Sequence, residues 1–77
     1  MSKSINVAIL GASGYTGSEL VRLLLRHPDF RIAALSADSK AGRSMAEVFP
    51  QFAGVALPQL QKIEEIDLDA IDAVFAA

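Results

Sequence analysis

A mainly apolar block near the beginning of the chain predicts a buried β-strand. In an extended conformation Ile5, Val7 and Ile9 lie on one face, and Ala8 and Leu10 lie on the other. A strand with apolar residues on both faces is typical of a parallel sheet that helices cover on both sides. The pattern therefore favours an α/β fold from the first element onward.

The next regular stretch has the spacing of an α-helix. Leu20, Leu23 and Leu24 follow an i, i+3, i+4 pattern, and Val21 and Leu25 widen this apolar stripe. We expect the stripe to face the sheet and to belong to the core.

Both ends of this helix carry sequence signals. Thr16 and Glu19 have the spacing of a capping box, although Ser13 or Gly14 would serve equally as the helix start. The helix is expected to stop just before Pro28, because a residue that precedes proline avoids the helical conformation. The chain's only histidine precedes that proline and is expected to be a solvated helix end, not a catalyst.

The remaining pattern predicts a parallel sheet. Residues 30–36 predict a second strand, which forms a βαβ unit with a right-handed crossover. Glycine and proline then interrupt the periodicity, and only residues 45–48 have helical spacing. Residues 60–63 are expected to form a short edge strand, and residues 72–77 to begin a buried strand. The sequence thus predicts a partial Rossmann-type, doubly wound parallel sheet, the N-terminal part of a dinucleotide-binding domain.

Composition narrows the class of protein. The chain has 77 residues, of which 52% are apolar and 21% charged, with a net charge of −2 and no cysteine. These values describe one small soluble unit of marginal stability without disulfides. The charge gives no electrostatic footprint for nucleic acid, and the apolar runs are far shorter than the ~20 residues that cross a bilayer. We therefore expect a cytoplasmic protein without nucleic-acid or membrane partners.

The two ends of the chain bear on its organisation. Residues 1–4 lead directly into the first predicted strand, which leaves no room for a signal peptide. The last residues are apolar, whereas domains normally end in exposed polar segments. We expect residues 1–77 to be a truncated Rossmann domain of a longer polypeptide.

Three of the five glycines lie between the first strand and the helix, at Gly11, Gly14 and Gly17. Gly11 is expected to make a tight turn, Gly14 to let backbone N–H groups approach a phosphate, and Gly17 to bring the helix close to the sheet. The helix start adds unpaired N–H groups and the positive end of the peptide dipoles. This junction predicts a pyrophosphate site.

The glycine spacing is G-x-x-G-x-x-G and not the commoner G-x-G-x-x-G. The prediction of a nucleotide site therefore depends on the position of these glycines between a strand and a helix. A strand-to-helix turn without a ligand is the structural alternative. A P-loop is disfavoured because Ser18 and Glu19 follow Gly17, and the required lysine is missing.

The end of the second strand bears on the choice between NAD and NADP. Ser36 and Ser39 supply hydroxyl donors, and Lys40 and Arg43 supply positive charge. These groups suit the 2′-phosphate of NADP and favour that cofactor. The competing interpretation uses Asp38, whose carboxylate would bind the ribose 2′-hydroxyl of NAD. Solvated loop charges are a further alternative for the two cationic residues.

Five carboxylates lie between residues 64 and 72, where they alternate irregularly with apolar residues. This pattern favours a solvated surface with apolar anchors over a metal site, and no metal is predicted.

One continuous segment of the sequence resembles a known family. It is Gly11-Ala12-Ser13-Gly14-Tyr15-Thr16-Gly17-Ser18-Glu19-Leu20. Further matching segments are Arg22-Leu23-Leu24, His27-Pro28 and Ala34-Leu35-Ser36, with Ser39 and Gly42. Together they resemble the N-terminal part of the N-acetyl-gamma-glutamyl-phosphate reductase family, from about Ser4 to Ala77.

The resemblance implies an enzyme of arginine biosynthesis. In that family NADPH reduces N-acetyl-glutamyl 5-phosphate to N-acetyl-glutamate 5-semialdehyde with release of phosphate, after a cysteine thiolate attacks the acyl phosphate. A histidine assists proton transfer. Because this chain has no cysteine, the catalytic residues are expected in a second domain outside it, and the chain alone is expected to be inactive. The family also implies a homo-oligomer.

The family's cofactor positions carry over to this sequence residue by residue. They are Gly11, Ser13, Gly14, Tyr15, Thr16 and Gly17 for the pyrophosphate, and Ser36 and Ser39 for the 2′-phosphate, with Lys40 and Arg43 added for their charge. Tyr15 and Thr16 would act mainly through backbone N–H groups. The alternatives are an aspartate-semialdehyde dehydrogenase-like reductase, which fits Tyr15-Thr16 less well, and a non-catalytic nucleotide-binding module.

Overall fold

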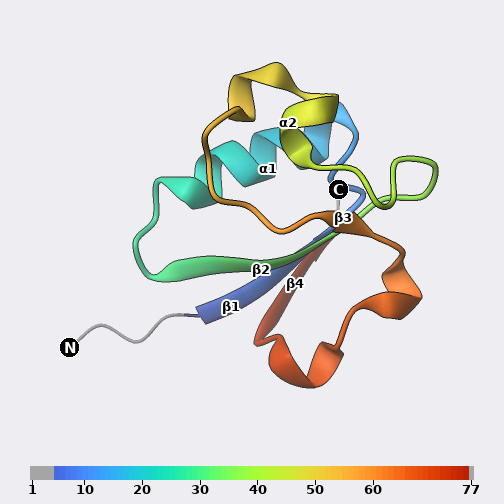
Figure 1. Ribbon diagram of the computed structural model, residues 1–77. Helices are drawn as coiled ribbons and strands as arrows, with labels where there is room; N and C mark the ends of the chain where they lie inside the picture. Colours follow the sequence, from blue (N-terminus) through green and yellow to red (C-terminus); the bar gives the residue numbers. More distant parts are fainter. Residues whose placement is uncertain (1–4, 77) are drawn as a thin grey trace.

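A computed structural model describes residues 5–76, which form a parallel sheet with helices on one face (Figure 1). The strands are β1 (Ile5–Leu10), β2 (Phe30–Ser36), β3 (Leu60–Gln61) and β4 (Ala73–Ala76), in the order β3-β2-β1-β4. All neighbouring strands are parallel. This topology confirms the predicted Rossmann-type α/β sheet.

The two faces of the sheet are covered very differently. The helices α1 (Tyr15–Leu25) and α2 (Met45–Val48) lie on the same side, above the sheet in Figure 1. They enclose the main core, which includes Val7, Ile9 and Leu35. The opposite face carries only a small cluster of Ala8, Ala34 and Ile66. We call these the thick face and the thin face.

Among residues 5–76, only the connection between β3 and β4 covers the thin face. This segment contains two short 3-10 turns, η2 (Ile63–Glu65) and η3 (Leu68–Ala70), and a third turn, η1 (Pro50–Phe52), follows α2 on the thick face. Ile66 anchors the connection, with Ile71 packed beside it. The carboxylates of the connection are exposed, which confirms the predicted solvated surface with apolar anchors.

Strand β2 contains an extra residue. Ile32 pairs with Val7, but the next residue of β1 pairs with Ala34, so Ala33 has no partner of its own. Such a bulge shifts the alternation of side chains along the rest of the strand. Leu35 consequently lies on the thick face, and Ser36 at the strand end points to the other side.

The predicted apolar stripe of α1 is partly confirmed, since Val21 and Leu24 are core residues and Leu20 packs against the core. The buried face is nevertheless rotated away from Leu23 and Leu25. The buried positions are Gly17, Ser18, Val21 and Leu24, whereas Leu23 is 47% exposed. The reason lies at the helix start, where Gly17 packs against the backbone of the preceding turn. That contact fixes the rotation of the helix, and the residues one and two turns later share the buried face.

The predicted capping box at Thr16 and Glu19 does not form. Gly14 is the N-cap, without a side-chain cap, and Thr16 already lies inside the first turn. Glu19 instead forms an ion pair with Arg22 at 2.8 Å. The hydrogen bond and the charge of that arginine lower the pKa of the Glu19 carboxyl. The predicted stop before proline is confirmed, since the helix ends at Leu25.

The edge strands differ from their predicted extents. β3 lies at the edge as predicted but ends at Gln61, because Ile63 begins a 3-10 turn. β4 was predicted as a buried strand, but it forms the other edge, and Val74 is 48% exposed. Val74 is exposed because no helix among residues 5–76 covers the thin face of the sheet. Ala77 lies outside the described residues.

Candidate functional site

The glycine turn joins β1 directly to α1. Gly11 has a φ of +75°, a conformation that L side chains rarely adopt, and Gly14 N–H donates to its carbonyl at 3.3 Å. Gly14 itself is extended and caps the helix, with Ser18 N–H donating to its carbonyl at 2.9 Å. The predicted tight turn at Gly11 is confirmed.

Gly17 and Gly14 serve different purposes in this turn. A Cβ at position 17 would lie 2.6 Å from the Cα of Ala12, so only glycine fits, as predicted. A Cβ at position 14 would meet only the Gly11 carbonyl oxygen, at 3.8 Å. The fold therefore does not require glycine at position 14, and its assignment to a phosphate stays a prediction.

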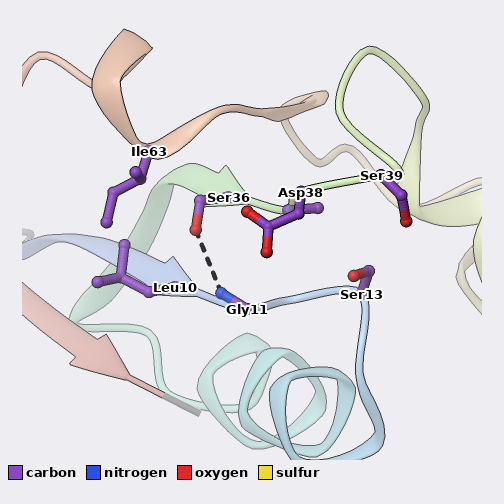
Figure 2. Close-up of a pocket in the computed structure, with 8 residues that line it drawn as sticks. Leu10, Gly11, Ser13, Ser36, Asp38, Ser39 and Ile63 are labelled. Atoms are coloured by element: carbon purple, nitrogen blue, oxygen red, sulfur yellow. Dashed lines mark hydrogen bonds between the residues drawn. The ribbon is translucent and has the colours of Figure 1, made fainter.

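Ser36 ties the end of β2 to the glycine turn (Figure 2). Its hydroxyl accepts a hydrogen bond from Gly11 N–H at 3.2 Å, and its carbonyl accepts from Ala12 N–H at 2.9 Å. The residue is 4% exposed. A serine hydroxyl that accepts a bond still carries a hydrogen to donate, so Ser36 can position the turn and contact a ligand.

A pocket of about 340 Å³ opens where β1 and β2 end. This is the edge at which parallel α/β sheets bind ligands. In Figure 2 the apolar side chains of Leu10 and Ile63 lie at one end of the pocket, and Ser13 and Ser39 lie at the other. Its lining residues are Leu10, Gly11, Ser13, Ser36, Ala37, Asp38, Ser39 and Ile63.

Only some of the predicted cofactor residues line this pocket. Gly11, Ser13, Ser36 and Ser39 do. The others lie outside its lining, and they are Gly14, Tyr15, Thr16, Gly17, Lys40 and Arg43. The first four of these form the start of α1, where Tyr15 is 88% exposed.

The two cationic residues belong to the surface turn after β2. Lys40 and Arg43 are exposed, and the backbone carbonyl of Arg43 accepts from Leu60 N–H at 2.8 Å. The backbone of Arg43 thus contributes to the sheet edge. Asp38, the residue of the NAD alternative, lines the pocket.

Sequence reasoning missed Leu10, Ala37 and Ile63 as pocket residues. Leu10 and Ala37 are adjacent in sequence to predicted site residues, so their position at the strand ends was a usable signal. Ile63 had no such signal, because its place depends on where β3 ends.

Neither a cluster of metal-ligating side chains nor a helix able to cross a membrane is found within residues 5–76. This part of the chain contains no group of three or more His, Cys, Asp or Glu side chains placed to hold a metal ion. None of its helices has the length and apolar character needed to span a membrane.

Comparison with known families identifies the class of domain. Residues 6–77 match the family model described as "Semialdehyde dehydrogenase, NAD binding domain". The chain belongs to this family, which makes a nicotinamide dinucleotide the class of its cofactor.

Similar curated relatives carry a more specific name. The N-acetyl-gamma-glutamyl-phosphate reductase of Cereibacter sphaeroides (strain KD131) is 64% identical over 72 residues, covering 94% of this chain and 21% of that protein. The reductase of the same name from Rhodospirillum rubrum is 61% identical over 77 residues, covering 100% of this chain and 22% of that protein. The resemblance predicted from the sequence is confirmed, and the chain spans about a fifth of these relatives' length.

A solved structure supports both fold and family. The aspartate semialdehyde dehydrogenase of Candida albicans, determined with NADP, superposes with a TM-score of 0.78 at 29% sequence identity. The match covers 97% of this chain and 23% of that protein.

Proposed function

We propose that this chain is the NADP-binding part of an N-acetyl-gamma-glutamyl-phosphate reductase. The reaction is the reduction of N-acetyl-glutamyl 5-phosphate to N-acetyl-glutamate 5-semialdehyde with release of phosphate, a step of arginine biosynthesis. The observation that carries the proposal is the glycine turn locked to β2 beside the pocket, in a chain 64% identical to a reductase of that name.

The residues of this chain fit a dinucleotide. Gly17 brings the start of α1 against the turn, where unpaired backbone N–H groups and the helix dipole favour a pyrophosphate. Gly14 leaves open space there. Ser13, Ser36 and Ser39 line the pocket with hydroxyl groups for the ribose end. When bound, NADPH supplies the hydride, and this chain binds and orients it.

The choice of NADP over NAD is part of the proposal. The pocket hydroxyls of Ser36 and Ser39 and the NADP of the Candida albicans neighbour support it. The position of Asp38 in the pocket lining favours the alternative, since a carboxylate suits the 2′-hydroxyl of NAD.

The rest of the enzyme follows from the same proposal. Residues 1–77 form a truncated NADP-binding domain, and the nucleophilic cysteine and its histidine lie in a substrate domain outside this chain. A cytoplasmic location is proposed from the composition of the chain, and a homo-oligomer is implied by the family. An aspartate-semialdehyde dehydrogenase-like reductase is the second candidate, because that enzyme is the structural neighbour.

Titration with NADPH and NADH tests the proposal directly. We expect the chain to bind NADPH more tightly than NADH, and Gly14→Val to abolish binding because its side chain fills the space of the phosphate. The fold tolerates this change, since the extended backbone of Gly14 suits valine and a Cβ there meets no close neighbour. Equal NADPH affinity of the variant and the wild type would remove the phosphate site, and preference for NADH would favour the Asp38 interpretation.

A reductase assay on the longer protein separates the two enzyme candidates. Phosphate-dependent reduction of NADP with N-acetyl-glutamate semialdehyde, and not with aspartate semialdehyde, is the expected result.

A further inference from the structure

A groove of about 700 Å³ lies on the thick face, where α1 ends and β2 begins. Eight of its nine lining residues are apolar, and the ninth is Arg31. Leu25 contributes from α1 and is 43% exposed, and Leu57 contributes from the coil before β3. The groove shares no lining residue with the pocket beside the glycine turn. It therefore leaves apolar surface in water that the proposed function does not use.

The short extent of β3 leaves this groove open. β3 pairs only with Leu35 and Ser36, so the first half of β2 has no neighbouring strand on that side within residues 5–76. The coil of residues 56–58 passes beside that half of β2 and lines the groove without extending the sheet (Figure 1).

The charge of the groove is positive and lacks a counter-ion. Within residues 5–76 the ion pair of the structure joins Glu19 to Arg22, so the Arg31 guanidinium has no carboxylate partner there. An apolar groove with one unpaired cation suits an occupant that presents an apolar side chain next to a carboxylate.

A surface of that kind is found on the thin face, at the turn η3. Leu68 is 62% exposed there, between Asp67 and Asp69. The Asp67 carboxylate accepts from Asp69 N–H at 3.1 Å, and the Leu68 carbonyl accepts from Ile71 N–H at 3.1 Å. These bonds hold the turn in shape and leave the leucine exposed. We call residues 67–69 the leucine tip.

We propose that the leucine tip of one copy of the chain inserts into the groove of a second copy. The apolar lining receives Leu68, and the flanking carboxylates meet the Arg31 guanidinium. Complementary charge selects this occupant, because the single charge of the groove is positive and those of the tip are negative. The tip and the groove lie on opposite faces of the sheet, so a molecule does not fill its own groove (Figure 1).

The proposed contact joins two different surfaces and is therefore head to tail. Each copy keeps a free groove or a free tip after the first contact, so association continues into a ring or an open chain. One leucine flanked by two carboxylates makes a small interface, which is typical of weak association. The contact does not depend on the cofactor, because neither the groove nor the tip shares a residue with the pocket.

Sedimentation equilibrium of the 77-residue chain tests the contact. We expect the average mass to rise above that of one chain with increasing protein concentration, and to fall again when salt screens the ion pairs. Leu68→Ser should weaken association about tenfold, because the burial of the leucine is lost. Leu23→Ser is the matched control, since it removes a 47% exposed leucine that lies outside the groove lining and the tip. It should associate as the wild type does.

A mixture of two variants separates a head-to-tail contact from a symmetric one. Arg31→Glu keeps the tip but places a negative charge in the groove, whereas Leu68→Ser keeps the groove but lacks the leucine. At concentrations where the wild type associates, each variant alone should be mainly monomeric. Their equimolar mixture should form dimers and no larger species, because only one intact tip and one intact groove can meet.

Charge reversal tests the ion pair separately. Asp69→Lys should weaken association, and it leaves in place the Asp67 carboxylate that holds the turn. Combining Asp69→Lys with Arg31→Glu in one chain should restore most of the association, because the two charges are exchanged. All the substituted positions are exposed, and far-ultraviolet circular dichroism checks that each variant keeps its fold.

Three results would overturn the proposal. The first is a wild-type chain that stays monomeric at every concentration. The second is equal association of Leu68→Ser and the wild type, which would point instead to pairing through an exposed strand edge such as β4. The third is a mixture of Arg31→Glu and Leu68→Ser that forms no dimer.

Discussion

The glycine turn and the β3–β4 connection both border the pocket, yet they are held in opposite ways. The turn is fixed by close contacts at its own backbone: Gly17 packs on Ala12, and the hydroxyl and carbonyl of Ser36 accept from the N–H groups of Gly11 and Ala12. The connection is a pair of 3-10 turns on the thin face, anchored chiefly by Ile66. The comparison teaches that one wall of the pocket is built into the sheet. The other is attached to the sheet by the apolar contacts of Ile66 and Ile71 and, at its far end, by hydrogen bonds between Asp72 and Asn6.

The largest effect is expected at the turn, from Gly17→Val. Its side chain would overlap the backbone of Ala12, which cannot move without disturbing β1, and we expect a loss of about 3 kcal/mol in unfolding free energy. Urea unfolding followed by circular dichroism measures it.

The matched control is Gly14→Val, the same substitution three residues earlier in the turn. It should change the unfolding free energy by less than about 1 kcal/mol, because the site is open. Equal destabilisation by both variants would contradict the packing role assigned to Gly17.

A smaller effect is expected on the thin face, from Ile66→Ala. Deleting a buried isoleucine from a thinly covered site should cost about 2 kcal/mol, at the low end for such changes because the loose surroundings can close the cavity. Urea unfolding measures the loss. Leu68→Ala, at an exposed position of the same connection, should change stability by less than about 0.5 kcal/mol. If Leu68→Ala proved the more harmful, Ile66 would not be the anchor.

The smallest effect concerns pH and the start of α2. The Ser44 N–H donates to the Glu47 carboxylate at 3.0 Å, and the Ser44 hydroxyl accepts from the Glu47 N–H at 3.2 Å. Hydrogen bonding with the backbone and side chain of Ser44 lowers the pKa of the Glu47 carboxyl. A lowered folded-state pKa adds stability above the ordinary carboxyl range, and that stability is lost as the pH falls. The urea midpoint should therefore fall slightly between about pH 6 and pH 3.

Glu47→Gln should reduce this pH dependence, and Glu64→Gln, at an exposed position of the connection, should leave it in place. Glu47 and Ser44 lie at the start of α2 on the thick face, away from the pocket. An identical pH profile for Glu47→Gln and the wild type would show that the capping bond has no energetic weight.

Sequence reasoning succeeded where a local pattern determines the structure. The apolar alternation of β1 and the spacing of the three glycines are local patterns that can be read along the sequence. They were enough to predict the strand, the turn and the close packing of Gly17. The family resemblance followed from the same string.

It failed where the outcome depends on contacts that the spacing of residues does not determine. The leucine pattern could not reveal the rotation of α1, because Gly17 sets it by touching Ala12. The capping box at Thr16 satisfied the spacing rule, but the real box is at Ser44 and Glu47, a pair with the same spacing. Ile63 was missed because only the end of β3 places it at the pocket.

The extra residue at Ala33 has a consequence for how such a strand can vary. Without it, strict alternation would turn Ser36 toward the helices and Leu35 toward the thin face. The inserted residue lets adjacent positions at the end of one strand meet two demands, because Leu35 packs under the helices while the Ser36 hydroxyl accepts from Gly11 N–H. A strand of strict alternation could not place these two side chains on those sides.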